Sequence, residues 1–358
     1  MAILTVPGRT ELAGNHTDHQ QGRVLASAIH LNIQAVFNAS SSPVVHLHSA
    51  GYDPIEVKLN QLSVRPAEFG TPVSLVRGVL SAFQDLGLQI GGFEASIHST
   101  LPIGAGLSSS AAFSVLIARI LSMLYNNNSV EDIVIARVAQ KAENVHFGKP
   151  CGLMSQFVCT TGHTLYVDFK TNEIQRIEDD FSDMGLTMCL TDTGGSHDGL
   201  NTSYARIPAD MTYIANLFDA GVLADVSPEE FRAKGWSASD RPVRRAMHFF
   251  DENERVPLMR DALLAHNGEE YMRLMNASGR SSEKLLNNVY TSSTGDTRLL
   301  EGLDLSASLL EGRGAWRVHG GGFAGCVQAL MPSDYFPLYR QKREAQFGEG
   351  SCFQIQLV

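Results

Sequence analysis

A glycine- and serine-rich stretch in the middle of the chain, LPIGAGLSSSAA at 101–112, has the residue types that bind phosphate. Gly104 and Gly106 permit a tight turn and a close approach of the backbone to a ligand. The stretch leads into AFSVLIARILSML, which is apolar on nearly every face and predicts a buried helix. The first turn of such a helix presents unpaired N–H groups and the positive end of the helix dipole, and both favour an anion. Three residues suit its N-cap: Ser108, Ser109 and Ser110.

This stretch differs from a Walker A loop because no lysine follows its glycines. The charge of a bound phosphate must then be met by backbone amides, a serine hydroxyl and a metal ion. The alternative is a serine-capped core helix after a tight turn, since short motif matches often arise by chance.

A second polar segment, GRTELAGNHTDHQQG, follows a strand predicted for residues 3–6. It crowds an Arg, acidic residues, histidines and glycines into a few positions, which is more typical of a ligand loop than of a simple connector. His16, taken alone, is equally consistent with a hydrogen-bonded structural histidine.

A third segment, VHGGGFAGCVQAL at 318–330, contains three consecutive glycines. Such a run costs chain entropy and indicates a close backbone approach at the turn formed by Gly320, Gly321 and Gly322. A packed turn between a strand and a helix is the alternative.

The whole chain has the size and composition of a globular protein with two domains. It has 358 residues, 44% of them hydrophobic and 18% charged, and its net charge of -10 provides no attraction for nucleic acid or an anionic membrane. The five cysteines are scattered, which favours reduced thiols. The N-terminus does not resemble a signal peptide, and no apolar run is long enough to span a bilayer. We therefore expect a cytoplasmic protein.

The elements that must position these segments can be predicted from periodicity and breaking residues. A strand at 92–99 feeds the first glycine turn, and a helix at 130–146 carries Glu143 before Pro150 and Gly152 interrupt it. Residues 24–37 predict a pair of strands, and 164–169 and 186–191 predict single strands. A domain boundary is placed between them, giving domains 1–180 and 181–358. The second half is predicted to be mostly helical, at 241–254, 256–267 and 269–288, with a closing strand at 352–358.

Together the three segments resemble the three motifs of the GHMP kinases, a family of small-metabolite kinases. The first, GR-x-x-L-x-G-x-HTD, resembles the galactokinase signature in particular. Further segments resemble galactokinase sequences along nearly the full length: KAENVHFGKPCGLMSQF, TSYARI and, more weakly, MNASGRSS.

The resemblance implies a two-domain α+β GHMP kinase fold. It implies an N-terminal ribosomal-protein-S5-like domain with a left-handed βαβ crossover, and a C-terminal ferredoxin-like domain. It further implies that ATP, Mg²⁺ and a sugar meet between these domains. No nucleic-acid or membrane partner is expected, and a monomer is the default expectation.

The resemblance also assigns roles to single residues. Arg9 matches the residue that stabilises charge on the transferred phosphoryl group, and Ser109 and Glu143 match magnesium contacts. The nucleotide phosphates would lie on a loop of seven residues: Gly104, Ala105, Gly106, Leu107, Ser108, Ser109 and Ser110. Sugar contacts would come from five residues: Asn15, His16, Asp18, Gly152 and Tyr204.

Three positions depart from the galactokinase pattern. Ser155 stands where the family has the Asp that takes or orients the hydroxyl proton, and serine is no base near neutral pH. Asn15 replaces the Glu before HTD, and His319 replaces the Thr or Ser before the last glycine run.

Three interpretations follow from these departures. The first, which we favour, is a galactokinase-like kinase with catalytic positions Arg9 and Ser155 and weakened base catalysis, in which Asp18 is a possible substitute base. The second is a silent relative that binds sugar and ATP as a sensor or regulator. The third is an ordinary galactokinase altered at Ser155, against which the second departure, Asn15, argues.

Overall fold

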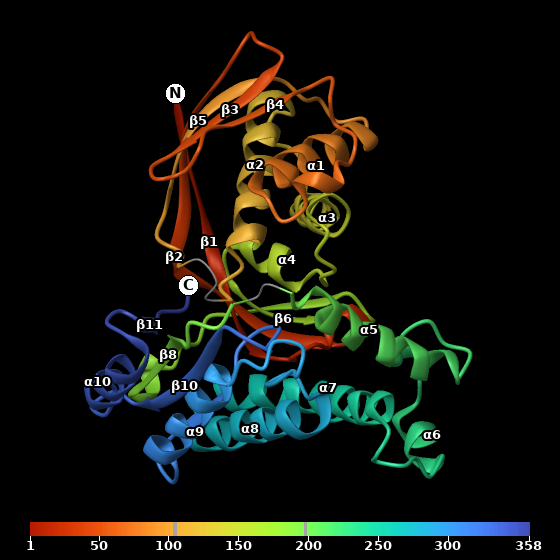
Figure 1. Ribbon diagram of the computed structural model, residues 1–358, viewed down its shortest axis with the longest axis vertical. Coiled ribbons are helices and arrows are strands. Elements are labelled where there is room, and N and C mark those ends of the chain that lie inside the picture. Colours follow the sequence, from red (N-terminus) through yellow and green to blue (C-terminus); the bar gives the residue numbers. More distant parts are fainter. Residues whose placement is uncertain (103–105, 197–198) are drawn as a thin grey trace.

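Two β-sheets, one in each half of the chain, organise the fold (Figure 1). The computed structural model describes residues 1–102, 106–196 and 199–358. Helices accompany both sheets, so the α+β class predicted from the sequence is confirmed.

The first sheet is seven-stranded, in the order β4-β3-β5-β2-β6-β7 with β1 paired to β2. Strands β3 and β5 pair in parallel, and β4 and α1 connect them. The strands of this sheet are β1 (Ala2–Ala13), β2 (Arg23–Ala39), β3 (Val44–Ser49), β4 (Ile55–Lys58), β5 (Phe93–Ser99), β6 (Thr164–Asp168) and β7 (Glu173–Ile177).

Two predictions for this sheet were wrong. Residues 24–37 belong to the single strand β2, because its first part pairs with β6 and its last part pairs with β5. Strand β1 continues past Pro7 through the GRTELA segment, and its pairing register shifts between Pro7 and Arg9. The first motif therefore starts inside a strand, which fixes its backbone more firmly than a loop would.

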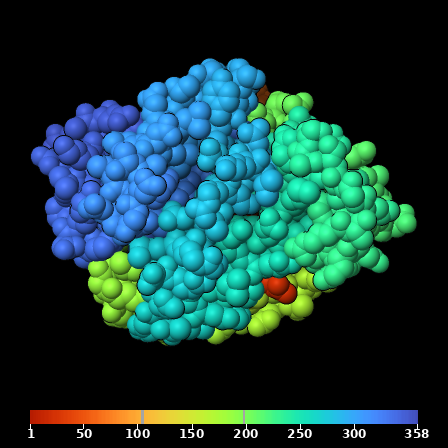
Figure 2. All heavy atoms as spheres, turned by 90° about the horizontal axis from the view of Figure 1, so that it is seen from below, coloured from red at the N-terminus to blue at the C-terminus, as the bar shows by residue number. Residues whose placement is uncertain are grey.

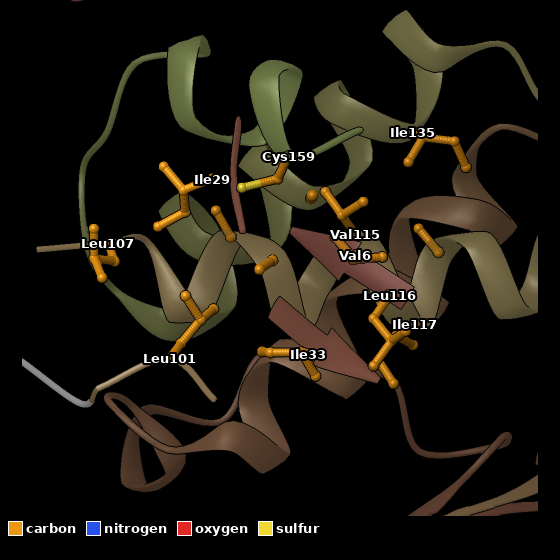
Figure 3. Close-up of a cluster of buried hydrophobic side chains, with 14 of the residues drawn as sticks. Val6, Ile29, Ile33, Leu101, Leu107, Val115, Leu116, Ile117, Ile135 and Cys159 are labelled. Atoms are coloured by element: carbon orange, nitrogen blue, oxygen red, sulfur yellow. The ribbon is translucent and has the colours of Figure 1, made fainter. Parts of the chain in front are cut away.

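The helices of the first half are α1 (Pro72–Asp85), α2 (Ser109–Tyr125), α3 (Asp132–Lys141), the π-helix Ala142–Phe147 and α4 (Met154–Thr161). Helix α2 is buried, as predicted. Figure 3 shows its Val115, Leu116 and Ile117 among side chains from β1, β2 and the helices around it, and all three are fully buried. The N-terminus of α2 is therefore held in place by the hydrophobic core.

The second sheet has the order β11-β8-β10-β9, and all its neighbours are antiparallel. Its chain order is a β-α-β-β-α-β arrangement, as in ferredoxin-like domains. The strands are β8 (Leu186–Asp192), β9 (Ala315–Val318), β10 (Cys326–Pro332) and β11 (Cys352–Ile355). The Gly320–Gly322 turn joins β9 to β10, so it is the turn of a hairpin.

Helices follow β8 and cover one side of the second half. They are α5 (Asn201–Asn216), α6 (Pro228–Ala233), α7 (Arg241–Leu264), α8 (Gly268–Ser281) with the π-helix Ser282–Leu286, α9 (Arg298–Leu310) and α10 (Phe336–Phe347). The predicted break near Arg255 was wrong, since α7 runs on through Pro257. Its buried Val256, Met259 and Leu263 hold that segment against the core despite the proline.

The end of β1 and the turn after it are covered by these helices. Seen from below, most of the face is formed by the second half, coloured green to blue; yellow-green parts from the middle of the chain lie at its rim, and a small red patch of the N-terminal part reaches the surface (Figure 2). In the part of the chain that the structure describes, no helix has the length and apolar character needed to cross a membrane.

Candidate active site

Arg9, on β1, connects the first motif to the glycine-rich turn. Its Nη1 donates to the Gly106 carbonyl oxygen at 2.7 Å, and its Nε donates to Ser155 Oγ at 3.0 Å. Its backbone N–H also donates to the Leu107 carbonyl oxygen at 3.3 Å. Arg9 is only 7% exposed, so these bonds fix the guanidinium at the start of α2.

Ser155, at the start of α4, accepts two hydrogen bonds. Besides Arg9 Nε, Ser108 Oγ donates to Ser155 Oγ at 3.0 Å. A serine hydroxyl has two lone pairs and one proton, so Ser155 has its acceptors occupied and keeps only its proton to donate. Ser155 is therefore a hydrogen-bond donor toward any ligand at this point.

The start of α2 is arranged to receive an anion. Ser108 is the N-cap residue, with a positive φ of 59°, but its side chain makes no cap hydrogen bond and turns to Ser155 instead. The first N–H groups of α2 are thus left without a side-chain cap. Ser108, Ser109 and Ser110 are partly exposed.

The remaining phosphate-loop residues differ in what they offer a ligand. The predicted residues Gly104 and Ala105 lie outside the described residues. Gly106 has a φ of +69°, which suits glycine. Leu107 is 1% exposed and packs in the core (Figure 3), so only its backbone is available for binding.

Asp18 and Gly152 lie against each other at the edge of this region. A Cβ on Gly152 would come within 1.9 Å of Asp18 Oδ2, so only glycine leaves room for the carboxylate. Asp18 Oδ1 accepts from the His19 backbone N–H at 2.9 Å. Burial raises the pKa of Asp18, while hydrogen bonds from the backbone of Met154 and His19 lower it in part.

The glycine turn between β9 and β10 contacts three of the predicted sugar-binding residues. Its successive carbonyl oxygens each accept one hydrogen bond: Gly320 from Asn15 Nδ2 at 2.7 Å, Gly321 from His16 Nε2 at 3.1 Å, and Gly322 from Tyr204 Oη at 2.8 Å. The first and third motifs are therefore joined through main-chain acceptors.

His16 has its ring nitrogens placed by this turn. Nε2 donates to a carbonyl, so Nδ1 is an acceptor in the neutral ring, and it lies 3.3 Å from His19 Nε2. Burial lowers the pKa of His16 to about 4. The ring is thus neutral at pH 7, and it acts in hydrogen bonding and not as a cation.

Asn15 is buried, and its amide is fully used in hydrogen bonds within the protein. It is 1% exposed. Its Nδ2 donates to Glu11 Oε1 at 3.2 Å and to Gly320, while its Oδ1 accepts from Ser282 Oγ at 3.2 Å and Asn288 Nδ2 at 3.1 Å. A primary amide has two N–H groups and two acceptor sites, so none is left for a sugar hydroxyl. The geometry thus gives Asn15 a structural role.

A buried ionic cluster, which the sequence did not predict, holds the backbone of the turn after β1 that contains Gly14 and Asn15. Glu252 Oε1, on α7, accepts from the backbone N–H groups of Gly14 at 3.2 Å and Asn15 at 3.4 Å. His248 Nε2 donates to the Asn15 carbonyl oxygen at 2.9 Å. Burial raises the pKa of Glu252, but Arg255, His248 and Arg317 outweigh it and lower the pKa to about 2.

Glu11 completes that cluster. Its carboxylate lies 3.3 Å from Arg317, and burial raises its pKa against the opposing effect of Arg317 and Arg9. Alternation could not have indicated that Glu11 faces inward, because residues 8–13 of β1 are all buried. The partners on α7 and β9 left no local signal in the sequence either.

Glu143 lies in the π-helix after α3, 3% exposed, and accepts hydrogen bonds from Gln156 Nε2 and, at 3.3 Å, from Cys151 Sγ. Its other oxygen, Oε1, is buried and has no hydrogen-bond partner among the described residues. Ser155 and Gln156 are adjacent on α4, so the helix that contacts Arg9 also contacts Glu143. Within the described ranges no cluster of three His, Cys, Asp or Glu side chains forms a metal site.

The sequence matches two family models. Residues 74–163 match the GHMP kinases N terminal domain, and residues 2–39 match the galactokinase galactose-binding signature. The chain is 30% identical to the galactokinase of Streptomyces coelicolor over 337 residues, which are 92% of this chain and 84% of that protein. It is 29% identical to the Homo sapiens galactokinase over 361 residues, covering 98% and 89% of the two chains.

The structure is similar to solved structures of a galactokinase and a mevalonate kinase. A crystal structure of Lactococcus lactis galactokinase complexed with galactose superposes with a TM-score of 0.87 at 25% identity, covering 99% of this chain and 93% of that one. The mevalonate kinase of Methanococcus jannaschii has a TM-score of 0.70 at 17% identity, covering 100% and 98%, so it shares the fold.

Proposed function

The chain belongs to the galactokinase family of GHMP kinases, and we propose that it transfers the γ-phosphate of ATP to a hexose, at the C1 hydroxyl of galactose. The observation that carries this proposal is the meeting of Arg9, Ser155 and Ser108 at the start of α2, beside Gly106. Three separate segments of the chain converge there.

Phosphoryl transfer requires positioning and charge stabilisation more than covalent chemistry from the protein. The uncapped N–H groups of α2 and the guanidinium of Arg9 are donors fixed before any ligand arrives, which makes them effective for a developing negative charge. Ser155, as a donor, orients an oxygen and does not accept a proton.

Loss of a general base at 155 slows the reaction by about 10²- to 10⁴-fold in typical cases. Asp18 is the carboxylate that we propose to receive or orient the hydroxyl proton in its place. Its burial against Gly152 and its raised pKa support this role, because a base works best when its pKa is nearer the working pH.

Membership of this kinase family also implies Mg²⁺. Glu143 fits a hard cation, because its buried Oε1 is an acceptor without a partner among the described residues, and Ser109 lies in the first turn of α2. When bound with ATP, the ion would neutralise phosphate charge. Glu143 and Ser109 would hold it, while Gln156 and Cys151 orient the Glu143 carboxylate.

We further propose that the two domains meet at residues 180 and 181, since the first sheet ends at Ile177 and the second begins at Leu186. A monomer in the cytoplasm completes the proposal.

The test is an assay with radiolabelled ATP and a panel of hexoses. We expect labelled phosphate on galactose or one close relative, and we expect Arg9→Ala to abolish it. Ser155→Asp should raise turnover by roughly tenfold or more, because it supplies a carboxylate that can take or orient the hydroxyl proton, and Arg9 Nε and Ser108 Oγ, which both donate, would hold that carboxylate in place.

If no hexose of the panel becomes labelled while calorimetry still detects ATP binding, the second candidate is favoured, a sugar and ATP sensor without turnover. The replacement of the family Asp by Ser155 is the observation that keeps this candidate open. An unchanged rate in Ser155→Asp would show that the sugar hydroxyl is not placed beside this residue.

A further inference from the structure

His319, directly after β9, lies between the first motif and the phosphate loop. It is 2% exposed. Its Nε2 lies 3.0 Å from Thr10 Oγ1 and 3.4 Å from the Glu11 backbone nitrogen. The other ring nitrogen, Nδ1, faces Gly106, since a Cβ on Gly106 would come within 3.0 Å of it.

A chain of hydrogen bonds that starts at Arg317 fixes which nitrogen of His319 carries the proton. Arg317 can only donate, and its Nε donates to Gln328 Oε1 at 2.9 Å. Gln328 must then present its NH₂ group to Thr10 Oγ1, at 2.9 Å. Thr10 Oγ1 accepts that bond, so its own proton is available for His319 Nε2.

Nε2 of His319 is therefore an acceptor, and the Glu11 backbone N–H, which can only donate, requires the same assignment. Burial lowers the pKa of His319 well below its usual range, so the ring is neutral and has a single proton. That proton is on Nδ1.

Nδ1 has no hydrogen-bond partner among the described residues. A buried N–H without a protein partner is rare in native proteins, and each such group calls for a partner of another kind or a functional role. Gly106, the residue opposite Nδ1, belongs to the turn before α2, and its carbonyl oxygen is bound by Arg9.

We propose that His319 binds the nucleotide: its Nδ1–H donates to a β- or γ-phosphate oxygen of ATP held at the turn that contains Gly106. This inference rests on the proposed function and adds a phosphate-binding residue to it. A neutral imidazole N–H supplies a donor at a position where the motif usually has the hydroxyl of Thr or Ser. The glycine at 106 puts no side chain against Nδ1, where a Cβ would come within 3.0 Å.

Calorimetry of the full chain with ATP, ADP and AMP, in excess magnesium, tests the proposal. His319→Leu removes the donor and should weaken ATP binding about tenfold or more, because hydrogen bonds to charged groups are the stronger ones. AMP binding should not change. Equal losses for ATP and ADP would assign the bond to the β-phosphate, and a loss for ATP alone would assign it to the γ-phosphate.

Two variants serve as controls. His319→Asn keeps an N–H near the place of Nδ1 and should retain more ATP affinity than His319→Leu. His98→Leu removes an exposed histidine on β5 and should bind all three nucleotides like the wild type. Unchanged ATP affinity in His319→Leu, or equal weakening of ATP and AMP, would overturn the proposal.

A measurement on the wild type covers the case in which His319→Leu does not fold. Nitrogen-15 NMR of labelled histidines should show His319 as the Nδ1–H tautomer, and its N–H proton resonance should move when ATP or ADP is added. An Nε2–H tautomer, or a resonance that stays fixed at saturating nucleotide, would contradict the inference. Neither experiment contains sugar, so a failure to phosphorylate hexoses would leave this result standing, while a wild type that binds neither ATP nor ADP would overturn both proposals.

Discussion

At the scale of single residues, the site is defined by how hydrogen-bonding capacity is distributed. Ser155 accepts from Arg9 and Ser108 and is left as a donor, whereas Asn15 uses its whole amide within the protein. These two of the three departures from the galactokinase pattern therefore have different consequences. Ser155 changes the chemistry at the proposed sugar site, and Asn15 changes the internal support of the turn after β1.

The Glu11–Asn15 pair gives a prediction at this scale. Asn15→Glu places a second buried carboxylate beside Glu11, whose Oε1 now lies 3.2 Å from Asn15 Nδ2, and removes the donor to Gly320. We expect a loss of about 3 kcal/mol or more in the free energy of unfolding, as for other uncompensated buried charges. Urea denaturation measures it.

The control for that prediction exchanges the carboxylate of position 11 and the amide of position 15. In Glu11→Gln/Asn15→Glu an amide again faces a carboxylate, so the double variant should be more stable than the sum of the single changes by about 1 kcal/mol or more. Strictly additive effects would show that the two side chains do not interact.

At the scale of elements, the hairpin turn between β9 and β10 organises the part of the site for which we propose sugar binding. Three successive glycine carbonyls bind Asn15, His16 and Tyr204, which come from the first motif and from α5. Two positions of this turn require glycine, because Gly320 and Gly322 have positive φ angles and a Cβ on Gly322 would approach the Asn288 carbonyl oxygen to 2.1 Å.

Gly321→Ala tests the turn itself. This glycine has no positive φ, but a Cβ there would come within 2.9 Å of the Tyr204 ring and displace it. We expect the KM for sugar to rise about tenfold, with a smaller change in the KM for ATP, because the displaced ring belongs to the sugar side. Steady-state kinetics measure both constants.

Gly221→Ala is the matched control, since no atom of the described residues beyond its chain neighbours lies within 4 Å of a Cβ at that position and its φ is not positive. Its kinetics should equal those of the wild type. Equal increases in both KM values for Gly321→Ala would mean that the turn supports the whole site and not its sugar side.

At the scale of the whole molecule, the two halves are held together by buried polar groups as well as by apolar contacts. Arg317 on β9 contacts Glu11 on β1. Glu252 and His248 on α7 bind the backbone of the turn that follows β1. Such a junction depends on protonation, because each group has been removed from water.

The stability of the protein should therefore fall in acid. His16 has a pKa of about 4 in the folded chain against an ordinary value of 6.5, so the unfolded chain binds its proton first as the pH falls. The stabilising contribution of neutral His16 is complete above pH 6.5 and is lost as the pH falls toward 4. Burial shifts the pKa values of His19, His248 and His319 in the same direction.

Glu252 extends this dependence to lower pH, since its contribution is present above its unfolded pKa of about 4.5 and is lost toward pH 2. The raised pKa values of Glu11 and Asp18 act in the opposite direction. We expect the histidines to dominate between pH 6.5 and 4, with a decrease of up to about 1.4 kcal/mol per pH unit for each group. Urea unfolding at a series of pH values measures this, and a flat or rising stability toward pH 4 would contradict it.

The sequence by itself determined the α+β class, the three motifs, the buried helix α2 and the family resemblance. These depend on short-range signals: glycines where the backbone must turn, apolar residues at helical or strand spacing, and fixed motif order. It could not show that β2 is one strand or that α7 passes Pro257, because neighbouring strands and the core decide both. Nor could it show which partners the side chains bind through their hydrogen bonds. Thr10 and His319 are 309 positions apart, and only packing of the two halves brings them together and thereby fixes the proton of His319.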